Sequence, residues 1–295
     1  MGGEWSSGAL LVSETWPARH RGKAIGLMQG GWAIGYIAAA IAAITILPRF
    51  GWRAMFFVGI APALFTLWIR RKVEEPAIWV EARRAGVTGK TTGESLLRLF
   101  DRRLVRFTLL CTLTSAFVMF AYWGLFSWIP GFLAKPLKDG GAGLGDVKGP
   151  IWTIPMNIGA LIGYATFGVI SDRIGRRPTF AAYLVISAVL VWIFGRTHDA
   201  TQLMVLGPLL GFFGSGYFSV FGAFIAELFP TRARGAAVGF CYNGGRMLSA
   251  AAPTLIGLLS TTYGIGGALT FLAIAFVAGA VAIYFLPETP ARELA

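Results

Sequence analysis

Long apolar segments recur along the 295-residue chain, separated by shorter polar loops. Each holds about 20 apolar residues, enough for a helix to cross a hydrocarbon core about 30 Å thick. In lipid, backbone amides must be hydrogen-bonded within their own segment or in a closed sheet. The strands of a membrane barrel alternate apolar and polar residues, so the continuous apolar segments of this chain favour helices. The pattern predicts an all-α membrane protein with spans at about residues 23–47, 52–69, 107–133, 150–170, 179–195, 201–226, 236–261 and 267–286.

Most basic residues fall in every second loop between these predicted spans, and therefore on one side of the membrane. Of the 26 Lys and Arg residues, nineteen fall in one set of alternating loops and six in the other, and Arg246 lies inside a span. The positive-inside rule places the nineteen-residue side in the cytoplasm, as in a bacterial inner membrane. A nucleic-acid site would need these charges on one folded face with stacking aromatic residues between them. We therefore expect no nucleic-acid partner despite the net charge of +12.

Few residues are available for catalysis or metal binding. Cys111 and Cys241 fall inside apolar spans, and the two histidines, His20 and His198, fall in loops. The many glycine pairs spaced four residues apart suit close helix packing, and none of them belongs to a complete G-x-x-x-x-G-K-[ST] phosphate-binding sequence. We expect no enzyme activity, no metal and no cofactor.

One loop sequence occurs twice, 213 residues apart. "SETWPARHRGKAIG" at residues 13–26 matches "AELFPTRARGAAVG" at residues 226–239. The identical pairs include Glu14 and Glu227, Pro17 and Pro230, Arg19 and Arg232, Arg21 and Arg234, Gly22 and Gly235, and Gly26 and Gly239. Chance similarity of two basic loops is the alternative, but both loops lie at equivalent topological places. The repeat predicts a duplicated six-helix unit, which is a known transporter architecture.

The repeat also predicts that the chain begins inside a helix. The offset places Met1 opposite Gly214, in the middle of span 201–226, and thirteen helical residues rise only about 20 Å. A parent with two six-helix bundles would then have about three and a half helices more than this chain. We expect residues 1–72 to be the rest of the N-terminal bundle, 73–103 a cytoplasmic linker, 104–287 the C-terminal bundle and 288–295 a cytoplasmic tail. We also expect the 295-residue form alone not to accumulate substrate.

Residues 168–177, "GVISDRIGRR", resemble the loop signature G-x-x-x-D-R-x-G-R-R of the major facilitator superfamily. The matching residues are Gly168, Asp172, Arg173, Gly175, Arg176 and Arg177. "GGEWSSGALLVSETWP", "YWGLFSWIP" and "PETP" are similar to the metabolite:proton symporters, nearest to the sialate and lactate (monocarboxylate) branch. The resemblance implies two bundles that rock around a central site.

The resemblance further implies that the signature loop gates the cytoplasmic side. Glu227 and Arg234, at neighbouring helix ends, could complete its charge cluster. Glu14 and Arg21 would serve an equivalent cluster in the first half.

Two ionisable residues at membrane depth are candidates for function, because such groups are costly there. Arg246 lies near the middle of the eleventh helix of the parent and could bind a carboxylate through two parallel hydrogen bonds. A structural arginine bonded to carbonyls is the alternative. Glu4 would lie near the centre of the complete fourth helix and could carry a proton. A packing hydrogen bond, or simple exposure at the start of the chain, is the alternative for Glu4.

Other polar and aromatic residues at similar depth could line the substrate pocket, although each of them taken alone is more often packing or interface material. They are Gln29, Tyr122, Trp123, Asn157, Tyr217, Tyr242 and Asn243. Gln29 is the first-half counterpart of Tyr242.

The sequence thus predicts a secondary active transporter that takes up a small organic anion, such as lactate or sialic acid, with protons by alternating access. Its expected partners are this anion, protons and the lipid bilayer, and we expect a monomer. A sugar carrier or an efflux antiporter of the same superfamily is the alternative within transport. A non-transporting membrane sensor and an inactive fragment are the alternatives outside it.

Overall fold

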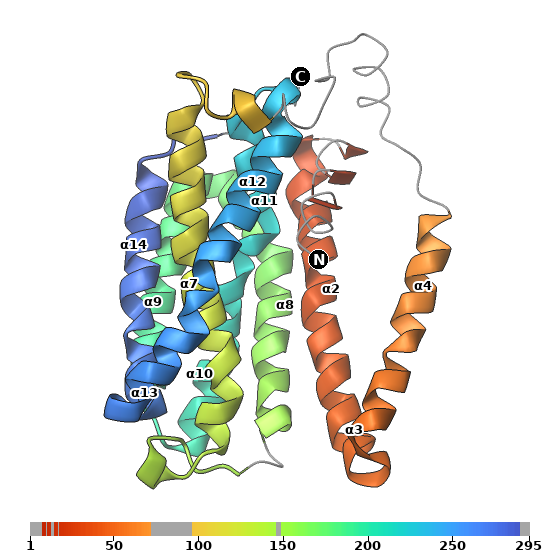
Figure 1. The fold of residues 1–295 in the computed structure, drawn as a ribbon, viewed down its shortest axis with the longest axis vertical. Helices are drawn as coiled ribbons and strands as arrows, with labels where there is room; N and C mark the ends of the chain where they lie inside the picture. The colour runs from red at the N-terminus through yellow and green to blue at the C-terminus, as the bar shows by residue number, and fades with distance from the viewer. Residues whose placement is uncertain are drawn as a thin grey trace.

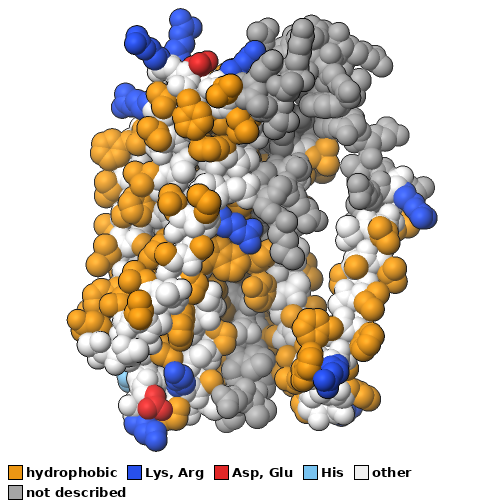
Figure 2. All heavy atoms as spheres, in the orientation of Figure 1, with side chains coloured by type: hydrophobic (Ala, Val, Ile, Leu, Met, Phe, Trp, Pro, Cys, Tyr) orange, Lys and Arg blue, Asp and Glu red, His pale blue; other side chains and the backbone are white. Residues whose placement is uncertain are grey.

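A computed structural model describes residues 8–9, 11–12, 15–16, 18–71, 96–145 and 149–289. Within these ranges all regular structure is helical, and seven segments are long and apolar enough to cross a membrane. The all-α fold predicted from the hydropathy pattern is confirmed. Basic side chains gather at the two ends of the molecule, while the flank between them is mainly hydrophobic (Figure 2).

The first group of helices, coloured red to orange in Figure 1, comprises α2 (Ala18–Thr45), α3 (Leu47–Val58) and α4 (Ile60–Arg70). Helix α2 packs along α8, whereas α3 and α4 diverge from the other helices (Figure 1). No residue of the apolar segment Leu47–Trp68 is buried. The hydrophobic surface of this segment is thus exposed along its whole length.

The remaining helices form one bundle (Figure 1). They are α7 (Val105–Ala134), the short 3₁₀ helix η1 (Leu137–Asp139), α8 (Gly149–Ile174), α9 (Arg176–Phe194), α10 (Ala200–Gly216), α11 (Phe218–Leu228), α12 (Thr231–Ser249), α13 (Ala251–Thr270) and α14 (Leu272–Tyr284). Helices α10 and α11 together form the predicted span 201–226, and α12 continues into α13 in the same way. The six predicted spans of the C-terminal bundle are therefore present.

In each predicted half, one glycine makes the turn between the last two spans. Gly51, inside α3, has φ 74° and ψ 175°, and Gly264, inside α13, has φ 69° and ψ 166°. Side chains other than glycine rarely adopt such angles, so each glycine permits the chain to reverse between two spans. The two positions are separated by the same 213 residues as the repeated loop. The repeat therefore extends to backbone geometry, which the sequence comparison did not reveal.

Glycines also bring α2 and α8 together. The backbones of Gly22 and Gly168 face each other, so a Cβ on Gly168 would stand 2.9 Å from the Gly22 carbonyl carbon. A Cβ on Gly26 would collide with the Tyr164 carbonyl. Helix α2 belongs to the predicted N-terminal half and α8 to the C-terminal half. This contact therefore joins the two predicted halves.

Part of the predicted linker 73–103 belongs to the folded bundle. Leu99 is fully buried, and its carbonyl accepts a hydrogen bond of 2.9 Å from the Thr108 hydroxyl on α7. Residues 72–95 lie outside the described part of the chain. The last residues of the predicted linker thus pack against the C-terminal bundle.

Candidate functional site

A cavity of about 460 Å³, here called the central cavity, lies between α2 and the C-terminal bundle. Helices α2, α7, α8, α11 and α12 contribute to its wall. The described residues that line it are Gly8, Met28, Gln29, Trp32, Tyr122, Trp123, Tyr164, Phe218, Tyr242 and Arg246.

Arg246 is the charged residue among these lining side chains. It lies in the last turn of α12, one helical turn after Tyr242, so both side chains share a face. Its guanidinium carbon stands 5.5 Å from the centroid of the Trp123 ring, in cation–π geometry. The cavity therefore contains a cation held against an aromatic surface.

Aromatic rings form most of the remaining wall. Trp32 and Trp123, which come from the two predicted halves, have ring centroids 6.3 Å apart and planes at 86°. Tyr122 stands 5.6 Å from Trp123 and 5.0 Å from Phe218, again measured between centroids. Trp32 lies three residues after Gln29 on α2, which places both on the cavity side of that helix.

The structure brings five predicted pocket residues into this one cavity. They are Gln29, Tyr122, Trp123, Tyr242 and Arg246. Their roles in binding stay predictions, but their convergence from three helices was not visible in the sequence.

Three other predicted pocket residues lie outside the central cavity. Tyr217 is fully buried in the aromatic core, with its ring centroid 4.8 Å from that of Phe218. The Asn243 amide donates to the Gly239 carbonyl at 2.8 Å, because it follows Tyr242 and so points about 100° away around the helix. The Asn157 amide donates to the Thr153 carbonyl at 2.8 Å and lines a different cavity.

This second space, here called the outer cavity, measures about 530 Å³. It lies beside the end of α7 that leads to η1, and its wall includes Tyr36, Phe126 and Asn157. Tyr122 lines both cavities. The Tyr122 side chain therefore stands between the two spaces.

Sequence reasoning missed Met28, Trp32, Tyr164 and Phe218 in the wall of the central cavity. For Trp32 a signal existed, because its spacing from Gln29 puts both residues on one helix face. Tyr164 had no such signal, since it lies in a continuous apolar run.

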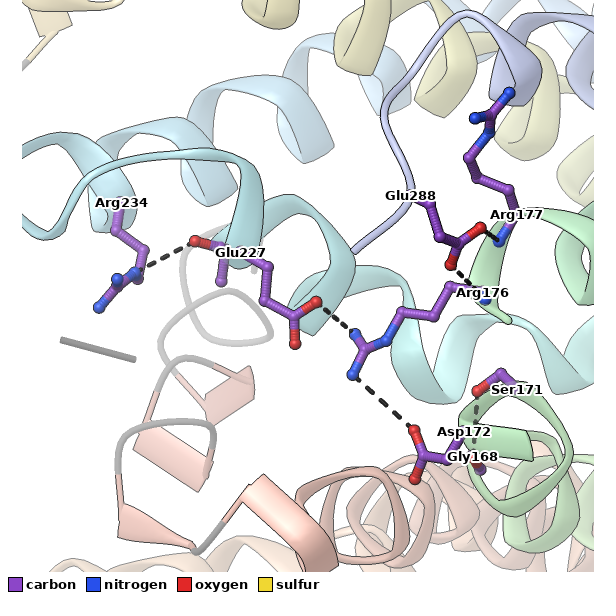
Figure 3. A network of polar contacts seen from close by, with 9 residues as sticks. Gly168, Ser171, Asp172, Arg176, Arg177, Glu227, Arg234 and Glu288 are labelled. Carbon is purple, nitrogen blue, oxygen red and sulfur yellow. Dashed lines mark hydrogen bonds and ion pairs between the residues drawn. The ribbon is translucent and has the colours of Figure 1, made fainter. Parts of the chain in front are cut away.

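At the predicted cytoplasmic end, Arg176 is the first residue of α9, and its side chain contacts acidic residues on two other helices (Figure 3). Its guanidinium lies 2.9 Å from Glu227 on α11 and 4.0 Å from Asp172 on α8. The side chains of Arg176 and Glu227 are each only 3% exposed. Three predicted gate residues thus meet in one cluster.

Glu288, after the last helix, completes this cluster (Figure 3). Its carboxylate accepts hydrogen bonds from the backbone N–H groups of Arg176, at 2.6 Å, and Arg177, at 3.1 Å. A carboxylate is favourable at the N-terminus of a helix, where N–H groups are unpaired. The Arg177 side chain in turn donates to the Tyr284 carbonyl. Glu288 belongs to the "PETP" sequence, in which the sequence analysis saw a family marker and no contact.

The other predicted gate residues have different places. Gly175 has φ 106°, which explains the glycine between α8 and α9. Arg234 is buried, and its Nε donates to the Ala226 carbonyl at 3.1 Å (Figure 3). Arg173 is exposed.

The structure does not describe the predicted proton carrier or the side chains predicted to form the gate of the first half. Glu4, Glu14 and the side chain of Arg21 lie outside the residues that the structure describes. The proposed proton carrier and the first-half gate therefore stay predictions.

One known protein family matches the chain along its whole length. The family model of the Major Facilitator Superfamily matches residues 1–163 and 149–295. The chain belongs to this superfamily. It is therefore a multi-pass integral membrane protein of a family of transporters, and not an enzyme.

Curated members of the superfamily are similar along most of the chain. A Haemophilus influenzae protein named for metabolite transport is 32% identical over 299 residues, covering 100% of this chain and 72% of the relative. The cis,cis-muconate transport protein of Acinetobacter baylyi is 30% identical, covering 94% of this chain and 67% of the relative. The sialic acid transporter NanX of Escherichia coli is also 30% identical, covering 94% and 66%. The chain thus spans about two thirds of the length of these relatives.

A solved structure shares the fold. The proton:xylose symporter XylE, bound to 6-bromo-6-deoxy-D-glucose, superimposes with a TM-score of 0.71 over 97% of this chain and 68% of its own. The two sequences are only 20% identical, so the likeness establishes the fold and nothing about the substrate.

Proposed function

We propose that the protein takes up a small organic anion together with protons, by alternating access, across a bacterial cytoplasmic membrane. The anion would bind in the central cavity, between α2 of the first half and the helices of the second. The Asp172–Arg176–Glu227 cluster lies within the second half, and a Cβ on Gly22 of α2 would stand 3.6 Å from its Asp172 carboxylate. This junction between α2 and the cluster would close the cytoplasmic end and separate as the halves rock. The excess of basic residues in the loops on that side supports this orientation.

Arg246 carries the proposal. It is a cation at membrane depth in a cavity whose described wall is mostly aromatic. A guanidinium in such surroundings is costly unless an anion or polar groups pair with it, and it can bind a carboxylate through two hydrogen bonds. A neutral sugar has no comparable need of it. We therefore favour an anion carrier over a sugar carrier.

The substrates named for two of the relatives support the proposal that this protein binds a carboxylate. Muconate and sialic acid are both organic acids, and both names belong to relatives that are 30% identical to this chain. We propose a carboxylate with a single charged group as the substrate; lactate and sialic acid, which the sequence resemblance suggested, belong to this class and are two members of the test panel. For proton coupling we propose Glu4, because the sequence predicts that this carboxylate lies near the centre of the complete fourth helix.

Replacement of Arg246 tests this proposal. In the protein expressed from its full reading frame, Arg246→Gln should weaken carboxylate binding about 10- to 100-fold, because a charged hydrogen bond contributes about 1.5–3 kcal/mol. Arg246→Lys should keep part of the affinity, since it keeps the charge but loses the planar geometry. Equilibrium binding of labelled benzoate, nicotinate, lactate and sialic acid measures both effects.

Arg196→Gln is the matched control. Arg196 stacks over Trp192, 4.2 Å from its centroid, at the end of α9 away from the cavity. This variant should bind as the parent does. If Arg246→Gln binds every member of the panel as tightly as the parent, the proposed role of Arg246 is wrong. Binding without accumulation in vesicles would instead indicate a sensor.

A further inference from the structure

We infer that the carboxylate bound in the central cavity has a flat, unsaturated body, as an aromatic ring carboxylate does. This inference rests on the proposed function, because it takes Arg246 as the partner of the carboxylate. It goes further by naming the part of the substrate that the rest of the cavity recognises.

The two tryptophans of the cavity form an aromatic corner. The planes of Trp32 and Trp123 meet at 86° with centroids 6.3 Å apart, and the two rings come from opposite halves of the molecule. A flat ring in this corner can lie against the face of one indole while the other indole contacts its edge. Both arrangements are favourable for aromatic pairs. A saturated ring has neither a π face nor a flat edge to offer.

Arg246 fixes where that body must lie. Its guanidinium stands over the Trp123 ring, so a carboxylate bound to Arg246 brings the attached atoms next to Trp123. Tyr122 and Phe218, with centroids 5.0 Å apart, continue the aromatic wall beyond it. The charged end and the body of the substrate are therefore recognised by neighbouring groups.

The polarity of the cavity disfavours a polyhydroxylated acid. Apart from Arg246, the polar side-chain groups of the described wall are the Gln29 amide, three tyrosine hydroxyls and two indole N–H groups. The Tyr164 hydroxyl already has the polar side chains of Ser215, Gln29 and Tyr122 as neighbours. A substrate with many hydroxyl groups would leave several of them unpaired, at a cost for each.

The size of the cavity disfavours a very small acid. Lactate has six heavy atoms and would occupy only a minor part of about 460 Å³. Most of the aromatic wall would then stay in contact with water. A ring carboxylate fills more of the space and removes this apolar surface from water, which is favourable.

A matched pair of ligands tests the inference. Benzoate and cyclohexanecarboxylate have the same number of carbon atoms and the same charge, but only benzoate is flat and aromatic. Each is titrated against labelled benzoate in equilibrium binding to the purified protein, expressed from its full reading frame. Binding is preferred to uptake because benzoic acid crosses bilayers unaided. Benzoate should bind about tenfold more tightly than cyclohexanecarboxylate. One aromatic contact increases affinity by a factor of about ten at most.

Two variants assign the preference to the corner. Trp123→Leu should reduce the ratio between the two ligands to about twofold or less, and Trp123→Phe should retain most of it. Trp32→Leu provides the same test from the other half if the Trp123 variants do not fold. Trp192→Leu is the control, since Trp192 is 51% exposed on α9 and lies outside the cavity wall.

The outcomes separate this inference from the proposed function. If labelled lactate or sialic acid binds in an Arg246-dependent way but cyclohexanecarboxylate competes as well as benzoate, the flat-body inference is wrong and the anion site stands. If no carboxylate of the panel binds, both fail. A benzoate preference that survives in both Trp123→Leu and Trp32→Leu also contradicts the inference.

Discussion

At the residue scale, two arginines within the fold have opposite surroundings. Arg176 lies against Glu227 and Asp172 and is nearly inaccessible, whereas Arg246 lies against Trp123 in an open cavity. A buried ion pair of the first kind is costly to break, because the remaining charge stays in a poorly solvated place. An arginine of the second kind is placed to accept an anion from outside. The first suits stabilisation of the C-terminal bundle and the second suits binding.

Loss of the Arg176 charge should destabilise the protein. Arg176→Gln removes the cation 2.9 Å from the Glu227 carboxylate, whose side chain is 3% exposed, and should cost about 3 kcal/mol of folding free energy. Thermal unfolding of the purified protein measures the effect. Arg173→Gln is the control from the same loop, because Arg173 is exposed and its loss should change stability by less than about 0.5 kcal/mol. Equal unfolding temperatures for the two variants would contradict the role given to the pair.

Glu288 should act as a cap of α9. Glu288→Ala removes the acceptor for the N–H groups of Arg176 and Arg177 and should cost about 1 kcal/mol. Glu288→Gln keeps one acceptor oxygen and should lose less. The comparison is again made by thermal unfolding, and a larger loss for Gln than for Ala would rule out capping.

Tyrosines show why the pocket was only partly predictable. Tyr164 and Tyr217 both lie in apolar helices, yet Tyr164 lines the central cavity and Tyr217 is buried in the core. Which way a side chain faces depends on how its helix packs, and a helix that is apolar all round carries no periodic signal of this. Arg246 was predictable because a charge at membrane depth is informative by itself.

At the scale of elements, the contact between α2 and α8 should control closure. Gly26→Ala places a Cβ against the Tyr164 carbonyl and should push the two helices apart. We expect a wider spin-label distance between α2 and α8 and a loss of transport. Gly31→Ala is the matched control on the same helix, because nothing lies within 4 Å of its added Cβ and alanine favours helix. Unchanged distances in Gly26→Ala would show that this contact does not set the spacing.

The two turn glycines should differ in sensitivity. Alanine at Gly51 is strained by the positive φ but meets no neighbour, so Gly51→Ala should cost about 1–2 kcal/mol. Gly264→Ala has the same strain, and its Cβ would also stand 3.0 Å from the Gly140 Cα. We therefore expect a lower unfolding temperature for Gly264→Ala than for Gly51→Ala. The reverse order would contradict the contact between these loops.

Sequence predicted the spans well because lipid imposes the same requirement on every residue of a crossing helix. It did not predict the interruptions inside spans, such as that between α10 and α11 at Tyr217. These depend on packing between helices. The predicted limit between spans 236–261 and 267–286 was correct, and Gly264 supplies its physical reason.

At the scale of the whole molecule, the repeat connects sequence, fold and proposed mechanism. The 213-residue offset relates both the basic loops and the glycine turns. The central cavity lies where α2 of one predicted half meets the helices of the other, and the glycine contacts between α2 and α8 lie beside Asp172 of the Arg176 cluster. Two similar halves around a shared site are what alternating access requires.

Proton-driven accumulation decides whether this protein is the proposed transporter. The protein, expressed from its full reading frame, is reconstituted into liposomes with an inward proton gradient, and uptake of the tightest-binding labelled carboxylate is followed. Protein-free liposomes and Arg246→Gln liposomes correct for passive entry of the acid. We predict accumulation above both controls that collapses when a protonophore is added. Uptake no greater than in the controls, or uptake indifferent to the gradient, would contradict proton-coupled anion transport.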